Sequence, residues 1–440
     1  MFARSDAGAF RKARLFGAIT FTVPLLTTLA LTPTLVKADF DEPFLIVEGP
    51  SGDQPTGARI AMNASGNMAY VVWIGSGTPG RIRGVRLSPD PSIPMPDSVS
   101  ISPPDYQALE PDLSMNQGGV TFIVWRYTMP DSPRIQLRRR AADGALGAIE
   151  DVSSASLSSV FLPRVAANVG GDAIIAWQGD NNRVYARFRA ANGSYGPTKI
   201  VSPSSEFAFN ARVAIAKNGM AVVVWQRGNG VKARTRSSDG TWGPIQLIST
   251  EGVEPQIAMT PAGNALVVWS RGGLIEARSR AADGVLGSPI TLSAPGENSD
   301  KAQVAMNGKG NALVVWRETL DGGKSRINVR ARSATAVVAP KQALTPSTGV
   351  ASDPQVAMNG GGHAVVVYTR TDSSNRRRVH ARTRSAAGAL GTSEQLSARG
   401  AEDFPHVAIA TNGTAIAVWQ GPSNENGTMY GIHGGLGTVP

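Results

Sequence analysis

Short runs of consecutive apolar residues, each closed by a large aromatic residue, recur along the 440-residue chain. The aromatic residues lie 44 to 52 positions apart: Trp73, Trp125, Trp177, Trp225, Trp269, Trp316, Tyr368 and Trp419. An internal period of about 20–50 residues is typical of an array of supersecondary units, each too small to bury a core alone. The pattern therefore predicts about eight copies of one unit.

The fifth and sixth copies show the unit most clearly. In the sixth copy, residues 303–307 form a short strand that ends at a glycine-rich turn, and residues 312–316 are apolar at every position. Such a run predicts a strand covered on both faces. In the fifth copy, strands at 274–280 and 288–293 flank a turn at Asp283-Gly284. We therefore expect four short antiparallel strands per copy, joined by tight turns.

Four short strands in each repeat, without helical periodicity of useful length beyond the N-terminal segment, predict an all-β fold, a β-propeller. The first strand of each copy carries a small residue at one position, as expected where strands crowd around the propeller axis. These residues are Ala61, Ser114, Ala166, Ala214, Ala258, Ala305, Ala357 and Ala408. The aromatic series lies on the second strand, where we interpret the rings as structural filling between blades and not as ligand-stacking surfaces.

The last copy, from about Phe404, supplies three strands and then ends in a glycine-rich segment. A candidate fourth strand stands ahead of the first copy, at residues 44–48. Placing both in one blade removes the open edge and closes the ring without disulfides. We therefore predict eight four-stranded blades in a single domain over residues 39–440, with seven blades as the alternative.

The first 38 residues have the composition of a signal peptide. A basic cluster of Arg11, Lys12 and Arg14 precedes an apolar stretch at 15–36, and Val36 and Ala38 are the small residues of a cleavage site. The alternative is an uncleaved membrane anchor, but two prolines interrupt the stretch. We expect removal of this segment, a secreted or cell-envelope location (periplasmic or extracellular), and no transmembrane segment afterwards.

Composition narrows the function classes. The formal net charge is +10, and removing the five basic residues and one acidic residue of positions 1–38 leaves 38 basic and 32 acidic residues, or +6. These charges are dispersed, whereas nucleic-acid binding proteins concentrate them on one face, so we expect no nucleic-acid partner. The absence of cysteine excludes thiolate catalysis and cysteine-ligated metal sites.

The turns between the third and fourth strands carry a recurring motif, seen as RAADG at 140–144, RSSDGTWG at 236–243 and RAADG at 280–284. It resembles the Asp-box (Ser-x-Asp-x-Gly-x-x-Trp) of sialidase-like propellers. Here Asp and Gly are adjacent, and the aromatic residue is present only as Trp242 and Tyr195. The resemblance implies a secreted bacterial propeller, often facing carbohydrate, in which these boxes are structural and do not mark an active site.

A sialidase-type enzyme would need clustered arginines, a tyrosine nucleophile and acid/base carboxylates. Arginine pairs two residues apart recur in six copies: Arg138/Arg140, Arg187/Arg189, Arg234/Arg236, Arg278/Arg280, Arg330/Arg332 and Arg382/Arg384. A catalytic centre is asymmetric, so we interpret these pairs as structural links between strands, with a repeated anion-binding row as the alternative. Catalytic residues are therefore not assigned, and Tyr106, Tyr127 and Tyr185 are the tyrosines that an enzyme would draw on.

Metal and cofactor sites are not predicted. The four histidines, His363, His380, His406 and His433, occupy different positions of different copies, and the HExxH spacing of zinc enzymes does not occur. We expect neither a metal nor a cofactor.

The loops between second and third strands and the linkers between copies vary most in length, and both sets lie on one rim of a propeller. An acidic residue often precedes the first strand: Glu110, Glu254, Asp353 and Asp403. These carboxylates are candidates to ring the channel mouth, where they would bind sugar hydroxyls or a cation. Inter-blade hydrogen bonding is the alternative role.

A rigid scaffold with variable loops on one rim is the usual construction of a binding surface. We expect a monomeric, non-catalytic binding protein for a glycan or a cell-surface protein. A sialidase-like glycoside hydrolase and a structural envelope protein are the alternatives.

Overall fold

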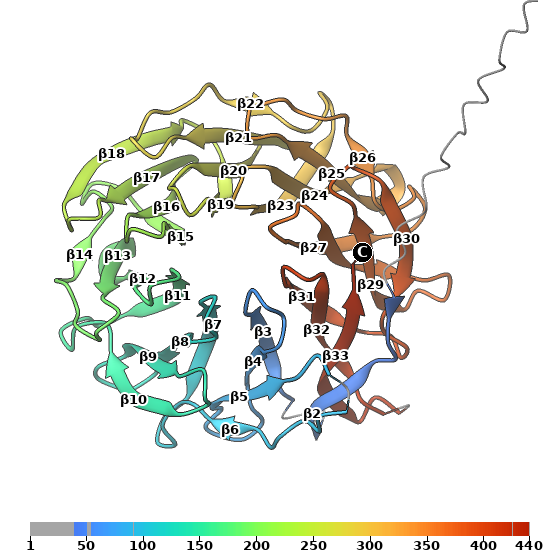
Figure 1. Ribbon diagram of the computed structural model, residues 1–440, viewed down its shortest axis with the longest axis horizontal. Coiled ribbons are helices and arrows are strands. Elements are labelled where there is room, and N and C mark those ends of the chain that lie inside the picture. Colours follow the sequence, from blue (N-terminus) through green and yellow to red (C-terminus); the bar gives the residue numbers. More distant parts are fainter. Residues whose placement is uncertain (1–38, 51–53, 91, 425, 440) are drawn as a thin grey trace, which may run out of the picture. The chain divides into compact units, whose positions relative to one another are not determined.

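The computed structural model describes residues 39–50, 54–90, 92–424 and 426–439, so the predicted signal peptide lies outside the described residues. The described chain forms a ring of eight antiparallel blades around a central axis (Figure 1). This confirms the predicted eight-bladed, all-β propeller. Among the described residues, helical structure is confined to two three-residue 3-10 turns, Asp180–Asn182 and Asp321–Gly323. The described part holds no helix with the length and apolar character needed to cross a membrane.

Seven blades are built from four consecutive strands each. The first two are β3 (Thr56–Met62), β4 (Ala69–Ile74), β5 (Ile82–Leu87) and β6 (Val99–Ser100), then β7 (Ala108–Met115), β8 (Thr121–Tyr127), β9 (Arg134–Arg140) and β10 (Leu146–Asp151). The next two are β11 (Val160–Ala167), β12 (Ala173–Gly179), β13 (Arg183–Arg189) and β14 (Lys199–Ile200), then β15 (Ala208–Ile215), β16 (Ala221–Arg227), β17 (Gly230–Arg236) and β18 (Trp242–Ser249). The last three are β19 (Val253–Met259), β20 (Ala265–Arg271), β21 (Leu274–Arg280) and β22 (Ile290–Thr291); β23 (Asn298–Met306), β24 (Ala312–Thr319), β25 (Ser325–Arg332) and β26 (Gln342–Ala343); and β27 (Ala351–Met358), β28 (Ala364–Thr371), β29 (Arg377–Arg384) and β30 (Leu390–Gln395).

The eighth blade combines both ends of the described chain. Its strands β31 (Asp403–Ile409), β32 (Thr414–Pro422) and β33 (Met429–Thr438) come last in sequence, and β2 (Phe44–Pro50) pairs with β33. The two-residue strand β1 (Asp39–Phe40) pairs with the far end of β33. The predicted closure is therefore confirmed, and the closing strand extends two residues beyond the predicted 44–48.

The blades differ most at their outer strands. Four of these, β6, β14, β22 and β26, contain only two residues, so the strand predicted at 288–293 shrinks to Ile290–Thr291. Pro197, Pro289 and Pro340 lie at or just before the start of three of them. Proline donates no ladder hydrogen bond, which limits pairing at these edges. The inner strand predicted at 303–307 instead begins at Asn298, because a bulge continues it outward.

The turns between the first and second strands follow one chemical plan. In five blades an asparagine side chain accepts a hydrogen bond, at 2.9–3.2 Å, from the backbone N–H of the residue just before the second strand: Asn63, Asn116, Asn168, Asn307 and Asn359. A glycine with positive φ stands three residues after each asparagine. Only glycine adopts this backbone at little cost, so the pair produces short, rigid hairpins on one rim.

The core consists of eight clusters, one at each blade–blade interface. In one of them Trp225 of β16 packs against Ile174 and Val184 of the preceding blade. All eight rings of the aromatic series are at most 1% exposed, which agrees with their predicted structural role. Burial of large rings between neighbouring blades joins the ring into one body.

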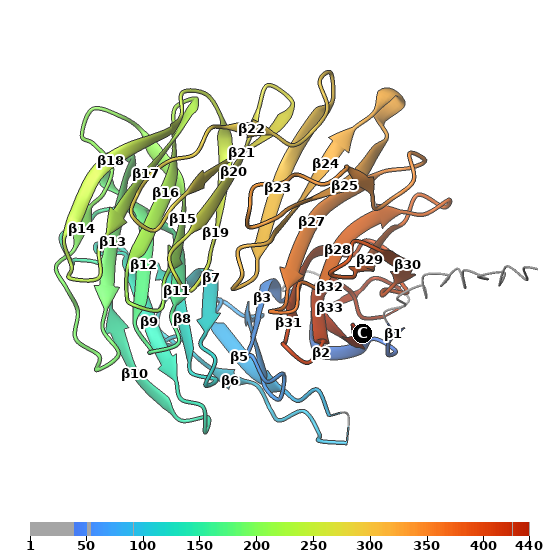
Figure 2. The ribbon, with the colours of Figure 1, turned by 45° about the horizontal axis from the view of Figure 1, so that its top comes forward.

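The innermost strands are β3, β7, β11, β15, β19, β23, β27 and β31, and they surround the axis (Figures 1 and 2). Each begins after a linker between blades and ends at a short hairpin. The linkers and the loops after the second strands therefore share one rim, which we call the loop rim, and the short hairpins form the opposite rim.

Candidate functional site: the axial cavity of the loop rim

Every innermost strand carries a β-bulge near its start, where one extra residue interrupts the pairing with the second strand. One residue in each bulge has a φ of 51–67°: Gly57, Glu110, Leu162, Asn210, Glu254, Lys301, Asp353 and Phe404. Seven of the eight are not glycine, and the left-handed backbone costs each about 1 kcal/mol or more. Bulges redirect side chains. Their presence in all eight strands makes them a built feature of the channel mouth.

An axial cavity of about 550 Å³ opens among these strands at the loop rim. All eight blades contribute to its lining. Its volume falls in the range of roughly 300–1,000 Å³ that is typical of small-molecule sites. The cavity is therefore large enough to hold part of a ligand, and every blade can contribute to recognition.

One layer of the lining comes from a single position, two residues before the small residue of each first strand. In ring order the layer holds Arg59, Asp112, Arg164, Arg212, Gln256, Gln303, Gln355 and His406. We call this set the lining ring. One side is charged and carries three arginines, and the other side is made of amides and an imidazole. Equivalent backbone positions thus present unlike chemistry around one cavity.

The charged side is held in a regular way. Asp112 accepts a 3.0 Å hydrogen bond from the backbone N–H of Val165 in the next blade, and Arg212 donates from Nε to Oε1 of Gln256 at 2.9 Å. Burial lowers the pKa of His406 well below its usual value, and the charges of Arg59 and Arg164 lower it further. His406 is therefore neutral at pH 7 and offers a donor and an acceptor, not a charge.

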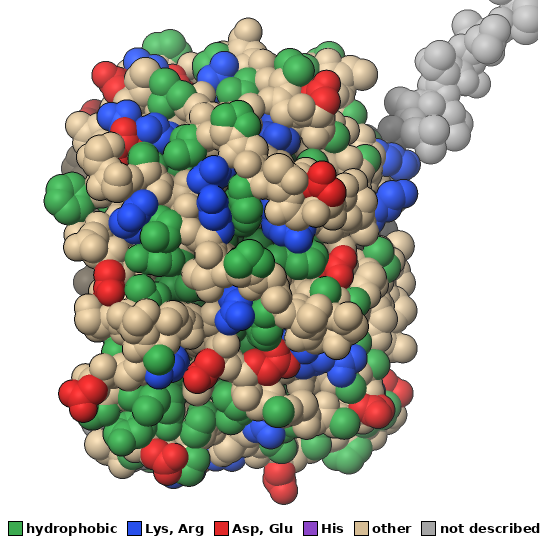
Figure 3. All heavy atoms as spheres, turned by 90° about the vertical axis from the view of Figure 1, so that its left-hand side faces the viewer, with side chains coloured by type: hydrophobic (Ala, Val, Ile, Leu, Met, Phe, Trp, Pro, Cys, Tyr) green, Lys and Arg blue, Asp and Glu red, His purple; other side chains and the backbone are tan. Residues whose placement is uncertain are grey.

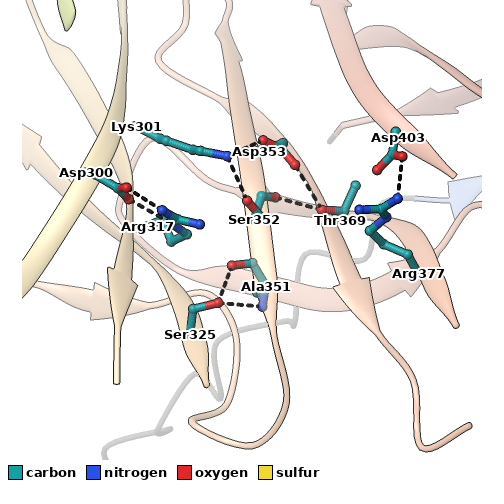
Figure 4. A network of polar contacts seen from close by, with 10 residues as sticks. All are labelled: Asp300, Lys301, Arg317, Ser325, Ala351, Ser352, Asp353, Thr369, Arg377 and Asp403. Carbon is teal, nitrogen blue, oxygen red and sulfur yellow. Dashed lines mark hydrogen bonds and ion pairs between the residues drawn. The ribbon is translucent and has the colours of Figure 1, made fainter. Parts of the chain in front are cut away.

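Two of the four predicted carboxylates line the cavity, Glu254 and Asp353. Glu254 is exposed, and its carboxylate makes no hydrogen bond or ion pair within the described part of the chain. Asp353 forms an ion pair with Nζ of Lys301 at 2.7 Å, and Lys301 also donates to Ser352 (Figure 4). Lys301 and Asp353 occupy the same bulge position in neighbouring blades.

The other two carboxylates join blades or neighbouring strands. Glu110 accepts a 2.6 Å hydrogen bond from the N–H of Leu162, the bulge residue of the next blade, and lies 3.3 Å from Nε of Arg126. Asp403 precedes its bulge by one residue and accepts a 2.6 Å hydrogen bond from Arg377 (Figure 4). These contacts are the inter-blade alternative considered for the four carboxylates, and neither residue lines the cavity.

The contacts of these carboxylates do not resemble a metal site. Three of the four have a cationic side chain within 3.3 Å. Across the described residues, there is also no group of three or more histidines and carboxylates suited to holding a metal ion.

Sequence reasoning missed the arginines of the lining ring. Arg59, Arg164 and Arg212 are isolated in sequence, whereas the six Arg-x-Arg pairs form a conspicuous repeated pattern. The sequence nevertheless contains a signal for these arginines. The small residue of the first strand hardly changes between copies, whereas the residue two positions before it varies. Comparing the copies position by position would have found the ring.

The arginine pairs of the third strands connect blades. Nε of the first arginine in every pair donates to a carbonyl nine residues later in its own blade, at 2.7–3.0 Å. Except at Arg234, Nη1 also donates to carbonyls in or just after the preceding blade's outer strand. The second arginine of four pairs reaches the preceding blade too, as Arg189 does with Glu150 at 2.8 Å. These contacts support the structural interpretation.

The tyrosines named for an enzyme do not reach the cavity. Tyr127 and Tyr185 are 4% and 7% exposed, and Tyr185 stacks on Trp177 with ring centroids 5.8 Å apart. Tyr106 is more exposed and packs edge-on against Tyr127. The described residues that line the cavity include no tyrosine.

Aspartates of the Asp-box-like turns have local contacts only. Asp143, Asp239 and Asp283 each accept a hydrogen bond from the N–H two residues later, at 2.8–2.9 Å, and the following glycine has positive φ. These are the contacts of a tight turn. They stabilise the hairpin, as the structural role of these boxes requires.

No protein-family model matches this chain, and no curated protein matches it in sequence. Its fold matches solved propellers. The BP39L lectin from Burkholderia pseudomallei aligns with a TM-score of 0.52 at 10% identity, covering 77% of this chain and 98% of the lectin. Sqt1 from Chaetomium thermophilum, solved bound to the N-terminus of ribosomal protein L10, aligns with a TM-score of 0.50 at 11% identity, covering 90% and 99% of the two chains. Identities this low show the fold alone.

Proposed function

We propose that this protein is a non-catalytic binding protein that takes a glycan or protein ligand at the axial cavity of the loop rim. The observation that carries the proposal is the divergence of the lining ring. The aromatic series is conserved among the copies within this chain, since seven of its eight members are tryptophan. The lining ring, on the same scaffold, contains four residue types. Repeats that serve structure alone have no need for such divergence around one cavity.

Two features support the class of ligand. The lining ring presents guanidinium, amide and imidazole groups, which suit the hydroxyls of a sugar. On the loop rim, a linker exposes Phe207 at 69% and the bulge of β31 exposes Phe404 at 55%. Exposed aromatic residues are typical of binding surfaces. A glycan with one sugar in the cavity and the adjoining sugars on the rim would contact both the polar lining ring and the exposed apolar side chains.

The two similar solved propellers agree with a binding role in general terms. One is a lectin and the other was solved with a peptide of a ribosomal protein bound. The side of the outer wall that Figure 3 draws carries positive and negative side chains scattered among neutral ones. A nucleic-acid partner would call for a concentrated basic face.

We also propose export and removal of residues 1–38, because the basic cluster, the apolar stretch and the small residues follow one another in the order of a signal peptide. The mature protein is then a secreted or envelope-associated monomer. The hydrolase alternative lacks support in the cavity, where a tyrosine nucleophile is missing from the described lining. A purely structural role does not account for the divergent lining ring.

A glycan array tests the proposal. The labelled protein is compared with the double variant Gln303→Ala/Gln355→Ala and with Gln117→Ala, which removes an exposed glutamine from the hairpin rim. We expect saturable binding to one class of glycan, lost in the double variant and kept in Gln117→Ala. Equal binding by all three proteins would place the ligand elsewhere, and cleavage of the bound glycan would support the hydrolase instead. If the array is silent, a cross-linked peptide mapped to the loop rim would support a protein ligand.

A further inference from the structure

Three arginines of the lining ring share one geometry. Nη1 of Arg59, Arg164 and Arg212 donates to the carbonyl of the residue immediately before it, at 2.8–2.9 Å. This bond holds each guanidinium in place beside its own strand. All three belong to the cavity lining. The arginines are therefore pre-positioned, and a ligand would not need to order them.

Their positive charge is only partly balanced. In the same layer Asp112 is the one acid, and one of its oxygens already accepts the N–H of Val165. None of the ion pairs within the described residues includes any of the three arginines. Nε and Nη2 of Arg59 and Arg164 have no hydrogen-bond acceptor in the described part of the protein. Donors of a fixed cation are thus directed at the cavity without a protein partner.

The pKa shifts of two of these arginines are consistent with an incompletely balanced positive charge. Burial lowers the pKa of Arg59, and the neighbouring Arg164 lowers it further, while Asp112 acts in the opposite sense. Burial lowers the pKa of Arg212 to about 9, and the charge of Arg164 contributes, while Asp112 and Glu254 act in the opposite sense. Both shifts mean that the charged forms are less stabilised than in water. An anion bound among the guanidinium groups would relieve this cost.

We propose that Arg59, Arg164 and Arg212 bind an anionic group of the ligand, a carboxylate or a phosphate, at the charged side of the cavity. Guanidinium groups match both anions through paired N–H donors. Gln303 and Gln355, on the amide side, then face the neutral part of the same ligand. This inference rests on the proposed function and narrows it to acidic ligands, such as an acidic sugar.

Calorimetric titration with three small probes tests the site. Glucuronate carries a carboxylate, glucose 6-phosphate carries a phosphate, and glucose carries neither. We expect one or both acidic probes to bind and glucose to show no saturation at the same concentrations. Binding of glucuronate alone would identify a carboxylate site, and binding of glucose 6-phosphate alone a phosphate site. Failure of both acidic probes, or equal binding of glucose, would overturn the inference.

Variants connect the binding to the cluster. Arg164→Gln should weaken the acidic probe by about 10- to 100-fold, as expected for loss of hydrogen bonds to a charged group. Arg86→Gln removes an exposed arginine on β5 and should leave the affinity unchanged. An unchanged affinity in Arg164→Gln would count against the site.

Thermal unfolding without ligand separates a binding role from a structural one. Loss of one of three mutually repelling charges should leave the melting temperature of Arg164→Gln unchanged or higher. A lower melting temperature together with unchanged anion binding would mean that the arginine is structural. If the acidic probes do not bind while a neutral glycan or a peptide still binds the loop rim, the anion site is refuted and the proposed binding function is retained.

Discussion

Replacing Arg278 by methionine should loosen one blade interface by a measurable amount. Nε of Arg278 donates to the carbonyl of Gly287 at 2.7 Å, and Nη1 donates to the carbonyls of Leu247 and Ile248 in the preceding blade at 3.2 and 3.0 Å. Arg234, at the same position one blade earlier, makes only the first kind of bond among the described residues. Methionine keeps an unbranched apolar stem and removes all donors.

The magnitude follows from that difference. A partly exposed hydrogen bond contributes about 1 kcal/mol, so the two additional bonds make Arg278→Met about 2 kcal/mol more destabilising than Arg234→Met. Unfolding about 400 residues changes the entropy by roughly 0.8 kcal/mol/K, so 2 kcal/mol corresponds to a difference of about 2–3 °C in melting temperature.

Differential scanning calorimetry on the two variants measures this difference directly, since each is the other's control. Equal decreases in both variants would refute the role of the inter-blade bonds. The absence of any decrease in Arg278→Met would refute the structural interpretation of the pair.

Three further predictions concern the aromatic series, pH and ring closure. Trp269→Phe should lower the free energy of unfolding by about 1 kcal/mol more than Trp225→Phe, as measured by chemical denaturation. The indole N–H of Trp269 donates a 3.0 Å hydrogen bond to the buried Glu276, whereas the indole N–H of Trp225 has no acceptor in the described chain. Burial lowers the pKa of His380 to about 4, so the unfolded state binds a proton more readily than the folded state. The melting temperature should therefore fall as the pH drops from about 6.5 to 4, and it should fall less in His380→Gln. A melting temperature that does not change with pH over this range would contradict the prediction. Gly431→Ala should release the β2 segment to limited proteolysis, because a Cβ there would lie 2.5 Å from the carbonyl oxygen of Val47; an intact β2 would contradict the closure argument.

Most of the architecture was predictable because it repeats. The aromatic residue of each second strand and the small residue of each first strand recur eight times, so each copy supports the interpretation of the others. Closure by residues 44–48 followed from an unmatched strand at each end. Outer strands were predicted less well, because edge pairing depends on a few prolines and not on a repeated apolar pattern.

The site was predictable only in part, because function lies in the positions that do not repeat. Glu254 and Asp353 belong to the cavity lining, whereas Glu110 and Asp403, which lie near the start of a first strand in the same way, serve inter-blade contacts. The bulge explains Asp403, which stands one residue before the bulge position, so that its side chain turns away from the axis. Glu110 occupies the bulge position itself, but its carboxylate is held by the N–H of Leu162 and by Arg126. The one-residue shift at Asp403 is not visible in the sequence without the backbone.

The pairing of β2 with β33 determines when the ring becomes complete. Leu45 and His433 are register partners, so nearly the whole described chain lies between the two halves of this contact. Contacts this distant in sequence carry a high closure entropy and form slowly. Until they form, the first and last blades present unpaired strand edges, which are open to association with other chains. We therefore expect the slow step of folding, and the period of greatest exposure to aggregation, to belong to this one blade.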